Sequence, residues 1–579
     1  MLMRRHVFVV AVAALSAVAL PAWSQDWAQW GKNAQHTNAT SAIGQPAQTI
    51  LADVVYDPFV AQEQADPLSG DDLLVHYQTP LVNGDNVFME FKTGTFTSVS
   101  HWETQTWQEK RLHWENGQLV IKWAFTSDWK PAPYGSIKSG PGWEPVFHAA
   151  LAGSSVIYIP GGGGTIFKVD QTTGAQIARI NPFGSAIDPD TYEAGPLTVD
   201  GAGNVYYNVI QLKHGQGWNA DVVNSWLVKV SATGVAQKAT YASLNPGAPA
   251  GNDKCLGIFN TNQLPWPPAP DAVPAMITCG SQRPGLNSAP AVAPDGTIYT
   301  VSTAHYSSRT SYMLAVNPNL TPKWATSMRD RFNDGCNVLL PPNGTPGGCR
   351  AGSTTGVDPA QNRPAAGRVL DDSSAVPIVA PDGAVFFGTY TRYNYFQGHL
   401  MKFGADGSYQ GGFLFGWDTT PGIFVHDGTY SIITKENHYS DGGSYCDDPV
   451  LCPGDRTASN PSDPEAYFIT RLDKNLNVEW RWQNLNPYSC SRDAGGQVTC
   501  VSDHPNGFEF CVNAPAIDKF GNTYNNSEDG NLYVVDPNGN LRENLFLQLA
   551  VGAAYTPLSL GGDGKVYTQN AGHLFVVGR

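Results

Sequence analysis

The chain has 579 residues, of which 41% are hydrophobic and 15% are charged, so it can bury a large core. Its 60 glycines, 42 prolines and 11% aromatic residues are typical of many short strands joined by tight turns, and we expect an all-β fold. The formal net charge of −15 repels phosphate backbones and argues against nucleic acid as a partner.

Residues 1–24 have the pattern of a cleavable signal peptide. Arg4 and Arg5 precede an apolar run from Val7 to Leu20, and an Ala-x-Ser sequence then ends at Ser24. We expect cleavage after Ser24 and a mature protein in the periplasm or outside the cell. No later stretch reaches about 18 uninterrupted apolar residues, so we expect no transmembrane segment in the mature chain.

Residues 49–579 contain eight copies of a strand-like unit, in which a turn is followed by a β-branched residue and an aromatic one. A small-residue strand such as "APAVAPDG" precedes most copies, and a second hairpin follows each copy. The aromatic markers are Phe88, Tyr158, Tyr206, Tyr299, Phe386, Tyr430, Tyr524 and Tyr567. Four antiparallel strands repeated eight times predict an all-β, eight-bladed β-propeller as a single domain.

The last unit lacks its outer strand, because the chain ends on "HLFVVGR". The stretch "TILADVVYDPF" from Thr49 to Phe59 lies upstream of the first complete unit and has no hairpin partner nearby. We therefore predict that this N-terminal strand closes the last blade. Residues 25–48 form an N-terminal segment before it.

Three stretches resemble the PQQ-like (pyrroloquinoline quinone) repeat propellers, which include quinoprotein alcohol dehydrogenases and assembly scaffolds. They are "DWAQWGKNAQHT" from Asp26, the hairpin "FKVDQTTGAQIARI" and the strand pair "APAVAPDGTIYTVS". The resemblance implies PQQ with Ca²⁺ as cofactor, but the vicinal Cys pair and the Cys-x-x-Cys-His haem segment of such dehydrogenases are missing. The turn Asp170 to Gly174 also lacks a following docking Trp. We therefore expect a member that is not a dehydrogenase.

Long insertions occur only between the second and third strands of a unit and between units, which places them on one face of the propeller. They are residues 91–108, 127–146, 207–223, 241–287, 325–373, 434–464 and 484–512. We call this the loop-decorated face, and we expect the binding surface there.

All nine cysteines lie in or beside these insertions, and an exported protein can oxidise them. Local pairing predicts disulfides between Cys255 and Cys279, Cys336 and Cys349, Cys446 and Cys452, and Cys490 and Cys500, which leaves Cys511 over. The alternative is a metal site, but no Cys-x-x-Cys occurs. We predict no metal site.

Polar residues beside the inner strands on the loop-decorated face line a central funnel. The candidates for binding a small polar ligand or a cation are His148, Asn287, His305, Asp372, Arg392, Glu436, His438, Asn513 and Glu528. The alternative for each is a structural role, in which it satisfies backbone groups or holds channel water.

Two classes of function fit these observations. The first is a binding scaffold that offers its loop-decorated face to a protein partner or a small extracellular ligand. The second is a secreted enzyme with its site in the central funnel, either a degenerate quinoprotein oxidoreductase or a hydrolase or lyase. No Gly-x-Ser-x-Gly, His-Glu-x-x-His or P-loop motif occurs, and the catalytic residues stay unknown. We favour the scaffold, because every motif is architectural.

Overall fold

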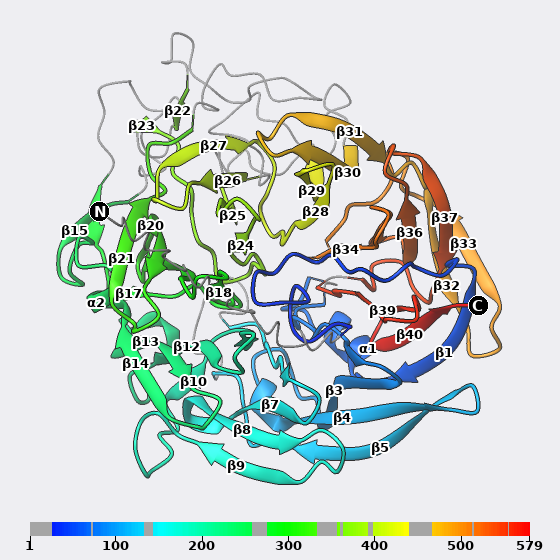
Figure 1. The fold of residues 1–579 in the computed structure, drawn as a ribbon, viewed down its shortest axis with the longest axis horizontal. Coiled ribbons are helices and arrows are strands. Elements are labelled where there is room, and N and C mark those ends of the chain that lie inside the picture. The colour runs from blue at the N-terminus through cyan, green and yellow to red at the C-terminus, as the bar shows by residue number, and fades with distance from the viewer. Residues whose placement is uncertain are drawn as a thin grey trace, which may run out of the picture.

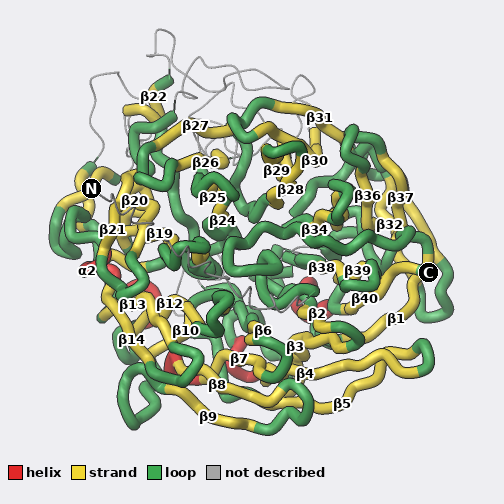
Figure 2. The backbone as a smooth tube through the Cα atoms, in the orientation of Figure 1, coloured by secondary structure: helices red, strands yellow, loops and turns green. Residues whose placement is uncertain are grey.

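Eight antiparallel sheets surround a central axis in the computed structural model of the protein (Figure 1). The structure describes residues 26–70, 73–132, 143–257, 275–332, 356–358, 363–391, 398–438, 466–511, 514–553 and 555–579. The predicted signal peptide, residues 1–24, lies outside this range. Strands and loops dominate, and helices are short (Figure 2). The predicted eight-bladed β-propeller is therefore confirmed.

Each blade contains four strands that follow one another outward from the axis. Blade 1 contains β2 (Leu81–Asn83), β3 (Asn86–Gly94), β4 (Gln105–Glu115) and β5 (Gln118–Thr126), and blade 2 contains β6 (Ala150–Ala152), β7 (Val156–Gly161), β8 (Thr165–Asp170) and β9 (Gln176–Ile180). Blade 3 contains β11 (Thr198–Val199), β12 (Val205–Gln211), β13 (Asn224–Val230) and β14 (Ala236–Thr240), and blade 4 contains β18 (Ala291–Val292), β19 (Ile298–Ala304), β20 (Ser307–Val316) and β21 (Pro322–Ser327).

The second half of the ring repeats this order. Blade 5 contains β24 (Ile378–Val379), β25 (Val385–Thr389), β26 (His399–Phe403) and β27 (Tyr409–Phe413), and blade 6 contains β28 (Gly422–His426), β29 (Thr429–His438), β30 (Ala466–Asp473) and β31 (Val478–Gln483). Blade 7 contains β34 (Ala516–Ile517), β35 (Thr523–Asn526), β36 (Asn531–Val535) and β37 (Leu541–Phe546), and blade 8 contains β38 (Ser559–Leu560), β39 (Val566–Asn570), β40 (His573–Gly578) and β1 (Thr49–Val55).

Short additional elements decorate the ring. β10 (Thr191–Glu193) and β17 (Gln282–Arg283) extend blades 3 and 4, and three separate hairpins and two α-helices lie in connections. The hairpins are β15 (Lys254–Leu256) with β16 (Met276–Thr278), β22 (Val357–Asp358) with β23 (Arg363–Pro364), and β32 (Tyr488–Arg492) with β33 (Val498–Ser502); the helices are α1 (Val60–Gln64) and α2 (Tyr241–Leu244). No helix in the described ranges is long and apolar enough to cross a membrane.

The N-terminal strand closes the ring as predicted. β1 pairs antiparallel with β40, from Thr49 opposite Gly578 to Val55 opposite His573. The strand stops at Val55 and does not reach Phe59, because the next two amides both donate to the carbonyl of Gly572 and the chain then turns into α1. The outer edge of blade 8 is thereby supplied by the other end of the chain.

The N-terminal segment before β1 lies across the centre of the ring (the dark blue trace in Figure 1). It hydrogen-bonds to the innermost strands of blades 1 to 7 in order and then to the β38–β39 turn of blade 8. The bonds join Trp27 to Val82, Ala28 to Leu151, Gln29 to Val199, Ala34 to Val292, Gln35 to Val379, Thr37 to Ile423, Asn38 to Ile517 and Gln45 to Gly564. This short segment therefore ties every blade to the others at the axis.

Trp30 fills the axis itself. Its side chain is 2% exposed and packs with Ala289, Val376 and Ala514, which come from three different blades. Its indole also stacks on the imidazole of His148, with ring centroids 5.4 Å apart. The channel is thus filled by side chains at this level.

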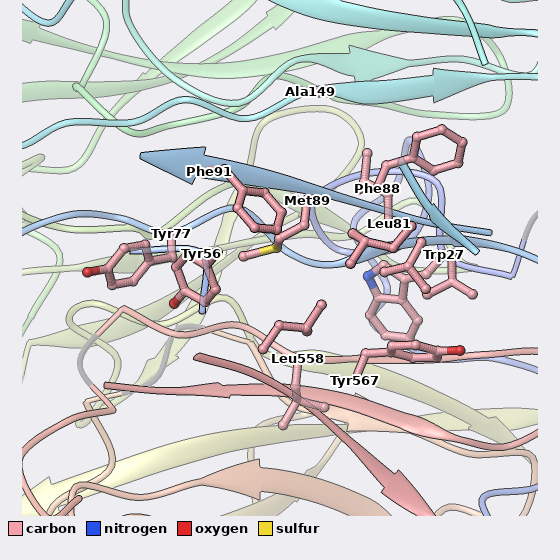
Figure 3. Close-up of a cluster of buried hydrophobic side chains, with 14 of the residues drawn as sticks. Trp27, Tyr56, Tyr77, Leu81, Phe88, Met89, Phe91, Ala149, Leu558 and Tyr567 are labelled. Carbon is pink, nitrogen blue, oxygen red and sulfur yellow. The ribbon is translucent and has the colours of Figure 1, made fainter. Parts of the chain in front are cut away.

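The hydrophobic core is continuous across the seam between the first and last blades. Trp27 lies between Leu81 of blade 1 and Tyr567 of blade 8, and Tyr56 faces Tyr77 at the other end of the cluster (Figure 3). The rings of Tyr56 and Tyr77 meet edge to face, with centroids 5.1 Å apart. Because large aromatic side chains are buried there, the seam between blades 8 and 1 is closed by hydrophobic packing, as an interface between neighbouring blades is.

Indoles dock between neighbouring blades. Trp123, Trp324 and Trp480 each donate from Nε1 to a backbone carbonyl in the third turn of the following blade, at 2.9 Å. Each ring lies where a Cβ on the turn glycine would stand, as Trp123 does at Gly174. The turn Asp170 to Gly174 therefore does receive an indole, which comes from the preceding blade.

Blade 1 buries an acidic cluster. Lys92 Nζ lies 2.7 Å from Asp57 Oδ2 and 3.6 Å from Glu63 Oε2, and all three side chains have no exposed surface. Glu90 and Glu109 each bond through one oxygen to Gln78, and each leaves Oε2 buried without a hydrogen-bond partner. Burial raises the pKa of Glu63 to about 7 and the pKa of Glu109 to about 8. The carboxyl group of Glu109 therefore keeps its proton at neutral pH.

Two of the predicted disulfides are confirmed. Cys255–Cys279 joins β15 to the chain just after β16, and Cys490–Cys500 joins β32 to β33. Cys511 is not in a disulfide. The other predicted pairs, Cys336 with Cys349 and Cys446 with Cys452, lie outside the described residues. Such bridges are typical of proteins that fold outside the reducing cytoplasm.

Candidate functional site

A chain of hydrogen bonds lies just before the innermost strands, at the place predicted for the floor of the central funnel. The two ring nitrogens of His76 contact Ser374 Oγ through Nδ1 and Glu144 Oε2 through Nε2, the latter at 2.5 Å. All three residues are buried, and burial holds the pKa of His76 well below its ordinary value. The neutral imidazole can donate from Nε2 to the Glu144 carboxylate and accept the Ser374 hydroxyl proton at Nδ1.

Tyr555 covers this chain. Its ring stacks on His76 with centroids 3.9 Å apart, and its hydroxyl donates to the backbone carbonyl of Asp372 at 3.4 Å. Its amide donates to the carbonyl of Cys511 at 3.2 Å. Tyr555 therefore joins the entrances of blades 1, 5, 7 and 8 at one place.

Carboxylates surround Tyr555 and Cys511. Burial and the negative charges of Glu144 and Asp418 raise the pKa of Tyr555 well above its ordinary value. Burial raises the pKa of the Cys511 thiol as well, and Glu528 adds to this effect. The funnel floor is consequently an acidic environment that favours positive charge.

Asp372 stands at the mouth of this acidic group. Its side chain is reached by water, yet many protein atoms surround it, and this partial desolvation together with Asp371 and Asp418 raises the pKa of Asp372 to about 6. Asp418 is buried, and this burial raises the pKa of its carboxyl group. It accepts from the amide of Ser374 at 2.8 Å and lies 3.6 Å from Lys435 Nζ. The accessible carboxylate of the group is thus Asp372.

A second network adjoins Asp372. Arg283 forms a two-pronged ion pair with Asp371 at 2.7 and 2.6 Å, and its Nε lies 3.0 Å from His305 Nδ1. Asn287 donates to the carbonyl of Asp371 at 3.2 Å. Burial and the guanidinium of Arg283 lower the pKa of His305 to about 4. This network fixes the position of the segment that carries Asp372.

The structure brings several predicted site residues together. His148 bonds through Nε2 to the carbonyl of His76 at 2.6 Å, so it lies beneath the floor beside Trp30, and burial lowers its pKa to about 4. Asn287 and His305 support the segment with Asp372, and Glu528 lies near Cys511. Arg392 and Asn513 lie outside the described residues.

Glu436 and His438 do not join this group. They pair with each other at 2.9 Å, and Glu436 also accepts from Thr470 and Arg481 of the neighbouring strands. Both side chains are buried within blade 6, because β29 extends to His438. In the described part of the chain, this pair is an internal ion-pair network of the blade.

Sequence reasoning missed His76, Glu144, Asp418 and Tyr555. The predicted residues lie directly beside the inner strands, whereas these four lie further along the connections between blades. His76 stands two residues before Gln78, which borders the first inner strand. Side chains two residues apart in an extended chain point to the same side, and this alternation was the signal that could have indicated His76.

The eight blades with docked indoles form a β-propeller, and the resemblance to PQQ-like repeat propellers seen in the sequence is confirmed at the level of the fold. No family model and no curated protein matches the chain. The chain is similar to a europium-containing methanol dehydrogenase, with a TM-score of 0.51 and 11% identity over 93% of this chain and 89% of that one.

Two further solved structures are similar. The quinohemoprotein alcohol dehydrogenase from Comamonas testosteroni gives a TM-score of 0.50 and 11% identity over 97% of this chain and 82% of that one. BamB from Moraxella catarrhalis gives a TM-score of 0.38 and 11% identity over 92% and 99% of the two chains. At 11% identity, the two dehydrogenase structures establish a shared fold alone.

The described residues do not fit a quinone with Ca²⁺. Among the described ranges, no three His, Cys, Asp or Glu side chains are arranged to hold a metal ion. Trp30 fills the axis against His148, and the sequence has no adjacent cysteines to cover a quinone ring. We therefore assign no step to this cofactor.

Proposed function

We propose that the protein is an exported binding scaffold, whose loop-decorated face takes a ligand or protein segment that carries a positive charge. The observation that carries the proposal is the acidic funnel around Tyr555, in which Asp372 is accessible and Asp418 and Glu144 lie behind it. An ammonium or guanidinium group fits such a site, because it gains from carboxylates and from an aromatic face. The signal-peptide pattern and the two disulfides support export to the periplasm or beyond.

Titration of the purified protein with spermidine, choline and L-lysine amide tests this proposal, with melting temperature and calorimetry as readouts. We expect saturable binding of at least one amine and at least fivefold weaker binding by Asp372→Asn. Asp406→Asn, in an exposed turn at the opposite ends of the strands, is the matched control and should bind normally. Absence of binding by all three amines would contradict the proposal. Saturable, Ca²⁺-dependent binding of PQQ would favour a dehydrogenase instead.

The Ser374–His76–Glu144 chain supports a second candidate function, that of a hydrolase in the central funnel. In such a reaction Ser374 Oγ attacks a carbonyl carbon, its proton passes to His76 Nδ1, and the leaving group takes that proton as the acyl bond breaks. Water then releases the acyl group from Ser374. Glu144 would orient the imidazole and stabilise its charged form.

A fluorophosphonate probe decides this alternative. A hydrolase would show a covalent mass increase on Ser374 that disappears in Ser374→Ala and in His76→Gln. An unlabelled Ser374 after prolonged incubation would leave the chain a structural role, which agrees with the 2% exposure of this serine.

A further inference from the structure

A pocket of about 520 Å³ lies on the rim of the ring, away from the funnel. Its walls are the outer strand β31 of blade 6, strands β36 and β37 of blade 7, and the hairpin β32–β33. The function proposed above does not use this pocket, so the two proposals stand independently.

The lining of this rim pocket combines aromatic rings with amide groups. Trp482, Tyr488, Tyr533 and Phe546 supply the rings, and none of the described residues that line the pocket is charged. The side-chain amide of Asn544 lies in the wall and forms no hydrogen bond within the described part of the chain. Polar groups and apolar faces are therefore presented together without a net charge.

The walls are held in place before any ligand arrives. The amide of Arg492 donates to Gln548 at 2.8 Å and the amide of Ala550 donates to Cys490 at 2.9 Å, which docks the hairpin on blade 7. The Cys490–Cys500 disulfide joins the two strands of the hairpin inside the pocket wall. A preformed site loses little conformational freedom on binding.

The floor is fixed by a carboxylate behind it. Asp529 is fully buried and accepts hydrogen bonds from the hydroxyl of Tyr533 and from Asn486 Nδ2, the latter at 2.9 Å. The ring of Tyr533 meets Trp482 with centroids 4.8 Å apart. The floor therefore offers two fixed aromatic surfaces, and Asp529 is hydrogen-bonded behind them by Tyr533 and Asn486.

We propose that the rim pocket binds a neutral, hydroxyl-rich ligand, namely a carbohydrate chain. Aromatic rings accept the apolar faces of sugar rings, and amides exchange hydrogen bonds with hydroxyl groups. A charged ligand would lose its hydration without gaining a counter-charge, and a purely apolar ligand would leave the amides desolvated. The composition of the lining thus selects neutral sugars over both.

Calorimetric titration with maltohexaose, cellohexaose and chitohexaose tests this inference on the full mature protein. We expect at least one hexasaccharide to bind with a Kd below about 1 mM. Tyr488→Ala should weaken that binding at least tenfold, and Asn544→Ala at least threefold. Tyr488 is 48% exposed, so its removal should leave the fold intact. Phe520→Ala is the matched control, because this ring is 56% exposed and lies outside the pocket.

Two outcomes would overturn the inference. One is that none of the three sugars saturates the protein at about 10 mM, far above the expected Kd. The other is that Tyr488→Ala binds as tightly as the unmodified protein, which would place the sugar elsewhere. In the first case, binding of a neutral decapeptide would assign the pocket to extended peptides.

Discussion

The buried acid Glu109 makes a quantitative prediction about the pH dependence of stability. In the folded protein its Oε1 accepts from Gln78 Nε2 at 3.0 Å, while Oε2 has no partner and no exposed surface. Burial raises its pKa from the ordinary 4.5 to about 8. Glu109→Gln keeps the acceptor oxygen and the shape of the protonated acid, but it cannot ionise.

The magnitude follows from proton linkage. Because the folded pKa is raised, the stabilisation by protonated Glu109 is fully present below pH 4.5 and is lost as the pH rises towards 8. Between pH 5 and pH 8 the folded state holds about one proton more than the unfolded chain, at about 1.4 kcal/mol per pH unit. Glu109→Gln should therefore stay within about 1 kcal/mol of the unmodified protein at pH 5 and exceed its free energy of unfolding by about 4 kcal/mol at pH 8.

Urea unfolding followed by tryptophan fluorescence at pH 5, 6, 7 and 8 measures this difference. Glu63 and Glu90 contribute to both proteins and largely cancel in the comparison. Glu115→Gln serves as control, because this carboxylate is exposed at the end of the same strand, and it should leave the pH profile unchanged. Parallel pH profiles for Glu109→Gln and the unmodified protein would refute the reasoning, because Glu109 would then ionise as easily in the fold as in water.

Three further perturbations test the ring itself, each by chemical unfolding. Trp30→Ala should lower the free energy of unfolding by about 3 to 5 kcal/mol, because it empties the axis, and a loss below about 1 kcal/mol would contradict its role there. Gly407→Ala should destabilise more than Gly428→Ala, since both glycines have positive φ but only at position 407 would a Cβ lie 2.6 Å from an indole carbon of the preceding blade. Replacing Cys255 and Cys279 by serine should cost about 3 kcal/mol for a separation of 24 residues, and equal stability would show that this loop is ordered without its bridge.

The sequence was sufficient to predict the blades because each inner hairpin repeats a local signal. A turn glycine, β-branched residues and an aromatic recur at every copy, and these features depend only on near neighbours in the chain. The closing strand from Thr49 could be predicted for a different reason, since the last unit visibly lacked a strand. Its end at Val55 could not, because the bonds to Gly572 that end it join distant parts of the chain.

The candidate site was predicted less completely, and strand length explains much of the difference. Glu436 and His438 were assigned to a strand exit, but β29 continues to His438, so both residues lie inside the blade. His76 and Tyr555 were missed because they meet only through the closure of the ring, which brings positions nearly 480 residues apart into stacking contact. Contacts of this kind have no local pattern to detect.

The path of the N-terminal segment links the architecture to the location of function. The stretch from Asp26 to Thr37, which carried the family resemblance, bonds to the inner strands near the short turns between first and second strands. Trp30 then fills the axis from that side, against His148. Because the channel is filled there, a ligand reaches the polar residues around Asp372 from the loop-decorated face alone. The short turns of the blade framework and the long loop insertions therefore lie at opposite ends of the same strands, so a rigid ring can carry a site built from its loops.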